Sequence, residues 1–143
     1  MLKKNLLLLV ACLFTFNSYC QDLKEHQWKN RLVLIISKDL TSDIFKRQSV
    51  TLASKTEELK QRKIIVYKII SENYQFEYSN KNTIQNDKIF QKYNKADNIF
   101  KLILIGLDGG IKLEQTEFLS TEKLFAIIDG MPMRRSEIRN NKN

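Results

Sequence analysis

Three short apolar runs divide the chain at regular intervals. Residues 31–37 read RLVLIIS, residues 63–70 read KIIVYKII, and residues 100–106 read FKLILIG. Continuous apolar runs of this length between polar ends are typical of strands that are buried on both faces of a sheet. We therefore predict that these three segments form the centre of the fold.

The segment between the first two runs predicts a helix. It has no Gly or Pro from residue 42 to residue 62, and Thr41 or Ser42 can serve as its N-cap. Its apolar residues recur every seven positions, at Phe45, Leu52 and Leu59. The polar segment 71–82 carries no periodic signal, and residues 83–94 permit a second, short helix.

A hairpin and a last helix follow the third apolar run. Asp108, Gly109 and Gly110 lie between that run and IKLEQTE, which alternates apolar and polar positions as a half-exposed strand does. We expect a type I′ turn at Asp108-Gly109, with positive φ at its central residues. The final helix begins after Ser120 or Thr121. Gly130 predicts a left-handed stop to this helix, and Pro132 then prevents its continuation.

This order of elements predicts an α/β fold of the thioredoxin-like type. We expect a four-stranded mixed sheet, with three parallel strands joined by helical crossovers, one antiparallel hairpin strand, and about three helices. A flavodoxin-like sheet is the alternative. It would need another helical crossover where the Asp108-Gly109-Gly110 hairpin stands.

The N-terminal residues resemble a secretory signal peptide. Lys3 and Lys4 precede an apolar run over 6–16, which is shorter than the roughly 20 residues that a membrane-spanning helix needs. We predict a signal peptide at 1–20, cleavage between Cys20 and Gln21, and a single domain at 21–143 with a basic tail from about residue 131. Lipid attachment at Cys20 is the alternative, and we expect no stable membrane span in either case.

Cleavage there would remove both cysteines, Cys12 and Cys20. The exported domain would then have neither a disulfide nor a thiol nucleophile. The signal carries two of the 24 basic residues and none of the 16 acidic ones, so the formal charge falls from +8 to +6. Because this charge is dispersed along the chain, it favours a soluble, lysine-rich surface; a polyanion of the envelope or matrix as partner is the alternative, and no nucleic acid is expected.

Three segments carry a resemblance to a known family: HQWKNRLVLII, FKLILIGLDGGIKLE and LFAIIDGMPMRRSE. Together they resemble a thioredoxin-like domain of unknown function, DUF 4174, of small exported bacterial proteins with related domains in animal extracellular-matrix proteins. The resemblance implies the fold and an extracytoplasmic location, but no activity. Where redox-active relatives carry cysteines after the first strand, this chain has Lys38-Asp39-Leu40-Thr41-Ser42. Thiol–disulfide exchange is therefore not expected.

Few residues suggest a site. One histidine, His26, without cysteines gives no metal site, and we expect it to be a surface residue; the glycines match no phosphate-binding loop, so no cofactor is expected. Lys38 and Asp39 would lie at the carboxyl end of the first strand, where they could bind an anion or cap the next helix. The remaining binding candidates are in the tail: Arg134, Arg135 and Glu137.

We therefore predict an exported, non-redox binding module for an extracytoplasmic macromolecule, with the charged tail as its contact. The alternative is an enzyme of non-thiol type that uses the loop after the first strand.

Overall fold

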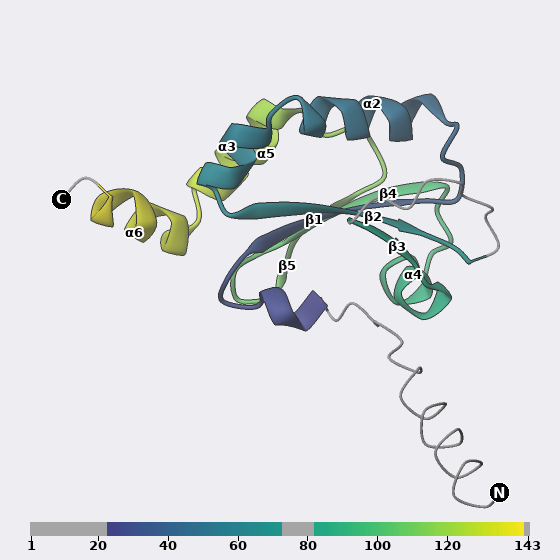
Figure 1. Cartoon of the computed structure of the whole chain (residues 1–143), viewed down its shortest axis with the longest axis horizontal. Helices are drawn as coiled ribbons and strands as arrows, with labels where there is room; N and C mark the ends of the chain where they lie inside the picture. The colour runs from purple at the N-terminus through teal and green to yellow at the C-terminus, as the bar shows by residue number, and fades with distance from the viewer. Residues whose placement is uncertain (1–22, 73–81, 142–143) are drawn as a thin grey trace, which may run out of the picture.

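The computed structural model describes residues 23–72 and 82–141, so the predicted signal peptide and the Cys20–Gln21 cleavage site lie outside the described residues. The described chain forms a five-stranded mixed sheet with the order β3-β2-β1-β4-β5 (Figure 1). The strands are β1 (Arg31–Ser37), β2 (Ile64–Ile70), β3 (Thr83–Gln85), β4 (Phe100–Ile105) and β5 (Ile111–Gln115).

Helices cover both faces of this sheet. They are the 3₁₀-helix η1 (Leu23–His26) and the α-helices α2 (Asp43–Ala53), α3 (Thr56–Gln61), α4 (Asp87–Tyr93), α5 (Thr121–Asp129) and α6 (Pro132–Asn140). Figure 1 shows α2, α3 and α5 on one face, η1 and α4 on the other, and α6 projecting from one end. The domain therefore has three layers, with α6 as an appendage.

The sheet separates two apolar cores because successive side chains of a strand point to opposite faces. In β1, Val33 and Ile35 pack into the core under α2, α3 and α5, and Leu34 and Ile36 pack into the core under α4. Every residue of β1 is buried. This confirms the prediction that the first apolar run is a strand buried on both faces.

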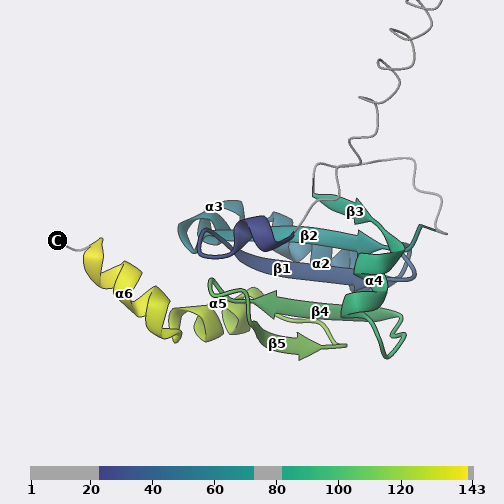
Figure 2. The same ribbon diagram turned by 90° about the horizontal axis from the view of Figure 1, so that it is seen from below.

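The direction of β4 was predicted wrongly. It runs antiparallel to β1, with Phe100 beside Ser37 and Ile105 beside Leu32. A parallel crossover would have to carry the chain back along a strand of about 23 Å, whereas a helix of seven residues such as α4 spans about 10 Å. Figure 2 shows α4 crossing the strand ends from β3 to β4, so β4 starts at the end where β1 stops.

The predicted counts of strands and helices were also too low. Residues Thr83–Gln85 form β3, which pairs in parallel with β2, instead of opening a helix. A strand of three residues is too short to show a period of two. The predicted helix over 42–62 divides into α2 and α3, where the hydroxyls of Ser54 and Thr56 donate to the carbonyls of Thr51 and Ala53 (2.8 and 2.9 Å).

The hairpin between β4 and β5 is confirmed, but its turn type is not. Asp108 has no positive φ, and only Gly109 does, at 82°. The Asp108 carboxylate accepts a hydrogen bond from the Gly110 amide (3.0 Å), and the Gly106 amide donates to the Gly110 carbonyl (2.8 Å). The side chain of Asp108 therefore closes the turn, and a single left-handed glycine is sufficient.

The predicted C-terminal tail is a helix. Gly130 has a φ of −75° and is right-handed, so the prediction of a left-handed stop was wrong. Pro132 occupies the first turn of α6, where its missing N–H costs nothing and its fixed φ suits a helix. Pro132 therefore begins a new helix after α5 ends, and Arg134, Arg135 and Glu137 lie on this helix.

Candidate functional site

The loop after β1 is closed by its own hydrogen bonds. One carboxylate oxygen of Asp39 accepts from the amide and the hydroxyl of Thr41 (2.8 and 2.6 Å), and the Ser42 hydroxyl donates to the Asp39 carbonyl (2.8 Å). The hydrogen bonds from Thr41 lower the pKa of Asp39. Lys38 forms an ion pair with Asp97. Both candidates therefore have partners within the chain, and their role in binding an anion stays a prediction.

Replacing Asp39 tests whether the carboxylate serves the loop. Asp39→Ala is expected to lower the melting temperature at pH 7, whereas Asp39→Asn, which keeps an oxygen for the Thr41 amide, retains most of it. Because the pKa of Asp39 is lower in the folded state, the stabilisation holds above its unfolded pKa and is lost as the pH falls through the folded value. Thermal melts from pH 7 to pH 3 check this. An unchanged melting temperature in Asp39→Ala, together with loss of turnover of a small substrate, would instead indicate an enzyme site.

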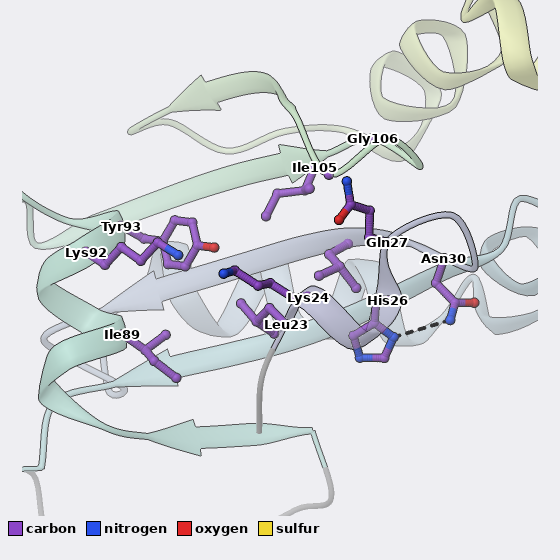
Figure 3. A pocket seen from close by; sticks show the side chains of 12 residues that line it. Leu23, Lys24, His26, Gln27, Asn30, Ile89, Lys92, Tyr93, Ile105 and Gly106 are labelled. Atoms are coloured by element: carbon purple, nitrogen blue, oxygen red, sulfur yellow. Dashed lines mark hydrogen bonds between the residues drawn. The ribbon is translucent and has the colours of Figure 1, made fainter. Parts of the chain in front are cut away.

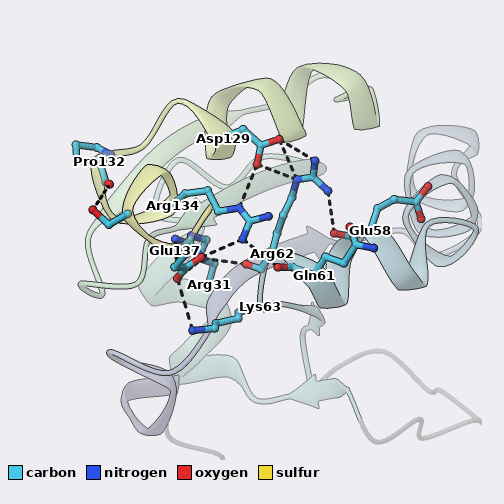
Figure 4. A network of polar contacts seen from close by, with 10 residues as sticks. Arg31, Glu58, Gln61, Arg62, Lys63, Asp129, Pro132, Arg134 and Glu137 are labelled. Carbon is cyan, nitrogen blue, oxygen red and sulfur yellow. Dashed lines mark hydrogen bonds and ion pairs between the residues drawn. The ribbon is translucent and has the colours of Figure 1, made fainter. Parts of the chain in front are cut away.

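A second group of polar residues joins α6 to the rest of the domain, and we call it the α6 anchor (Figure 4). It consists of Arg31, Arg62, Asp129, Arg134 and Glu137. Arg31 begins β1 and is fully buried, and its guanidinium donates to both carboxylate oxygens of Glu137 (3.3 Å each) and to the Arg62 carbonyl (2.9 Å). The first strand and the last helix are thus tied together directly.

Arg134 extends this anchor to two further elements. It donates to Asp129 (3.3 Å), to the Gln61 carbonyl (3.1 Å) and to Glu137 (3.2 Å). Burial alone would raise the pKa of Glu137, but hydrogen bonds from Arg31 and Arg134 lower it below its ordinary value overall. Two of the three candidates on the predicted tail, Arg134 and Glu137, therefore point inward and bind other parts of the same chain.

Arg62 completes the anchor from the end of α3. It forms a two-pronged contact with Asp129, in which the shortest distance is 2.7 Å, and its guanidinium lies 4.3 Å from the centre of the Phe125 ring. Sequence reasoning missed both Arg31 and Arg62, since a basic residue beside an apolar run is normally a solvated end. The spacing of Arg134 and Glu137 at i and i+3 was the one available signal.

The outer face of α6 remains accessible. Arg135 and Arg139 lie one helical turn apart and are both exposed, and Met133 between the two faces is 40% exposed. Arg139 donates to the Ser136 hydroxyl (3.2 Å). A shallow depression on this side is lined by Pro132, Arg135, Ser136, Ile138 and Arg139.

A cavity of about 290 Å³ lies between η1 and α4, on the face of the sheet that these two helices cover (Figure 3). His26 lies at its edge and is half-buried, in contrast to the surface position that we expected. Its imidazole is 2.9 Å from the Tyr67 hydroxyl and 3.3 Å from the Asn30 amide nitrogen. The histidine therefore joins η1 to β2.

The described residues offer neither a cluster of metal ligands nor a candidate membrane span. Across 23–72 and 82–141, no three His, Cys, Asp or Glu side chains are grouped so as to hold a metal ion. In the same part of the chain, no helix combines the length and the apolar composition that crossing a bilayer requires.

Solved structures identify the fold. A 2-Cys peroxiredoxin of Plasmodium vivax aligns with a TM-score of 0.58 at 11% identity, over 80% of this chain and 72% of its own. An exposed lipoprotein thioredoxin of Streptococcus pneumoniae gives 0.58 at 10% identity, over 76% and 89% of the two chains. A thiol:disulfide interchange protein of Chlorobium tepidum gives 0.55 at 9% identity, over 70% and 78%. The fold is therefore thioredoxin-like.

The amino-acid sequence places the chain in a narrower group than the fold does. Residues 22–137 match the domain of unknown function DUF4174, and the chain belongs to that family. No curated protein matches the sequence. The likeness to redox proteins, at 9–11% identity, concerns the fold alone.

Proposed function

We propose that this protein is an exported, non-redox thioredoxin-like domain that binds an anionic macromolecule of the cell envelope or matrix through the outer face of α6. The observation that carries the proposal is that the charged side chains of α6 lie on two different faces of the helix. Arg134 and Glu137 hold α6 to the domain, and Arg135 and Arg139 face outward.

The anchor prepares the helix for binding. A short basic segment that is disordered must lose conformational entropy when it binds, whereas a helix that is already held in place loses little. Arg135 and Arg139 are separated by one turn, or about 5.4 Å, and this spacing allows both to contact neighbouring anionic groups of one polymer. Guanidinium groups also bind sulfate, carboxylate and phosphate oxygens in a two-pronged geometry.

The sequence supports the other parts of the proposal. The only cysteines are Cys12 and Cys20, and the predicted cleavage before Gln21 removes both. A lipid-anchored form through Cys20 would keep the same domain at a membrane surface. The relation to domains of animal extracellular-matrix proteins stays a prediction from the sequence.

Heparin affinity tests the proposed surface. Arg135→Ala with Arg139→Ala is expected to weaken binding to heparin by about 2 kcal/mol, or about thirtyfold, because each basic residue near an anionic surface contributes about 1 kcal/mol. The affinity of the unchanged protein should fall steeply as salt rises. Titration calorimetry at several salt concentrations measures both effects.

A matched control removes two other charges. Lys88 and Lys95 are exposed, lie in or just after α4 and form no ion pair among the described residues. Lys88→Ala with Lys95→Ala lowers the net charge by the same amount and should leave heparin affinity within about twofold of the unchanged protein, since its charges are far from α6 (Figure 1). Equal losses in the two double variants would mean that net charge, and not α6, determines binding.

A further inference from the structure

The cavity between η1 and α4 has the construction of a small-molecule site. Its floor is made by Leu32 of β1 and Ile105 of β4, and its apolar walls come from Leu23 on η1 and Ile89 on α4. Tyr93 closes one side (Figure 3). At about 290 Å³ the cavity is just below the range for ligand pockets, which is about 300–1,000 Å³, and so is large enough for a small ligand only.

The two lysines among the described residues that line this cavity are both basic groups at its walls. Lys24 from η1 and Lys92 from α4 line it from opposite sides, and Figure 3 shows both side chains extended toward the space between the two helices. No carboxylate is among the described residues that line the cavity. Among these described lining residues, an anionic group on a ligand would therefore meet two ammonium groups and no carboxylate.

The polar wall is held in place before any ligand enters. His26 and Asn30 contact each other and His26 contacts the buried Tyr67, while the Gln27 amide donates to the Asp108 carbonyl in the hairpin (2.9 Å). These contacts connect η1 to β2 and to the hairpin. Preorganised walls reduce the entropy that binding costs.

We infer that this cavity binds a small organic acid with one carboxylate and an apolar aryl or alkyl body. The carboxylate lies between Lys24 and Lys92, and the apolar body lies on Leu32 and Ile105. This site is separate from the outer face of α6, which projects from one end of the domain (Figure 1).

Phenylacetate and hexanoate are suitable probes, with phenylacetamide as a neutral counterpart of the first. Addition of either acid to the purified exported protein is expected to shift the backbone amide resonances of Lys24, Asn30, Lys92 and Gly109, whereas phenylacetamide binds at least about tenfold more weakly because it lacks the charge. Two-dimensional amide NMR titrations give the dissociation constants.

Two variants on α4 separate the site from its surroundings. Lys92→Glu is expected to weaken phenylacetate binding by at least about tenfold, since it replaces attraction by repulsion. Lys88→Glu makes the same change one turn earlier on the same exposed helix, does not line the cavity, and should leave binding unchanged. Failure of both acids to shift these resonances would overturn the inference. Equal affinity for phenylacetate and phenylacetamide, or equal losses in the two variants, would also overturn it.

Discussion

Glu137→Ala is expected to lower the free energy of unfolding by about 3–5 kcal/mol, the usual cost of leaving a buried charge without its partner. The uncompensated charge is that of Arg31, whose side chain is 1% exposed. The guanidinium of Arg31 would keep its hydrogen bond to the Arg62 carbonyl, and Arg134 would lose one of its two carboxylates as well. Urea denaturation at pH 7 measures the loss.

Glu117→Ala is the matched control for this change. Glu117 is exposed, and its side chain forms no ion pair among the described residues, so the expected change is within about 0.5 kcal/mol.

Because the pKa of Glu137 is lowered in the folded state, the stabilisation that its carboxylate provides holds above the ordinary value of 4.5 and is lost as the pH falls through the folded value. The difference between Glu137→Ala and the unchanged protein should therefore narrow in acid. A loss below about 1 kcal/mol at pH 7 would contradict the anchor.

Gln48→Ala is the second change for which we expect a large loss, of about 2–4 kcal/mol. Gln48 on α2 is fully buried; its amide nitrogen donates to the Leu119 carbonyl (3.0 Å), and its oxygen accepts from the Leu119 amide (2.8 Å). Alanine would leave both backbone groups of Leu119 buried without partners, and each unsatisfied group costs about 1–3 kcal/mol. Chemical denaturation again measures the difference.

Gln48→Glu adds a pH dependence to this test. A buried glutamate has a raised pKa, and its protonated form can still donate to the Leu119 carbonyl, whereas the carboxylate cannot. Relative to the unchanged protein, this variant should be more stable at pH 4 than at pH 7. Gln91→Ala on the exposed side of α4 is the control, with no expected change. A Gln48→Ala variant as stable as Gln91→Ala would show that the pair with Leu119 contributes nothing.

The sequence predicted the strands well where burial on both faces removes polar positions, as in β1 and β4. It did not predict the direction of β4, since direction depends on how far the connecting chain reaches and not on the strand itself. The hairpin at Asp108 was predictable because few residues tolerate such a turn. Helix α6 was not predictable, because a glycine followed by a proline two residues later indicates the end of one helix as readily as the beginning of another.

The candidate site was predicted only in part. The tail was singled out for its charge, and Arg135 does lie on the exposed face of α6. The inward position of Glu137 was not predictable, because its partner Arg31 lies more than 100 residues earlier in the chain and no local pattern reports such a contact. The same holds for the hydrogen bond from Arg134 to the distant Gln61 carbonyl. The cavity between η1 and α4 also combines segments far apart in the sequence, so composition and spacing could not indicate it.

The proposed role of α6 is tested most directly by mapping where a polyanion binds. Amide NMR spectra of the exported protein, recorded with increasing amounts of a heparin-derived oligosaccharide, locate the contact residue by residue. We predict that the largest shifts fall at Arg135, Ser136 and Arg139 and that they disappear at high salt. Largest shifts at Lys38 and Asp39 in the loop after β1, or no localised shifts at all, would contradict the proposal that the outer face of α6 is the binding surface.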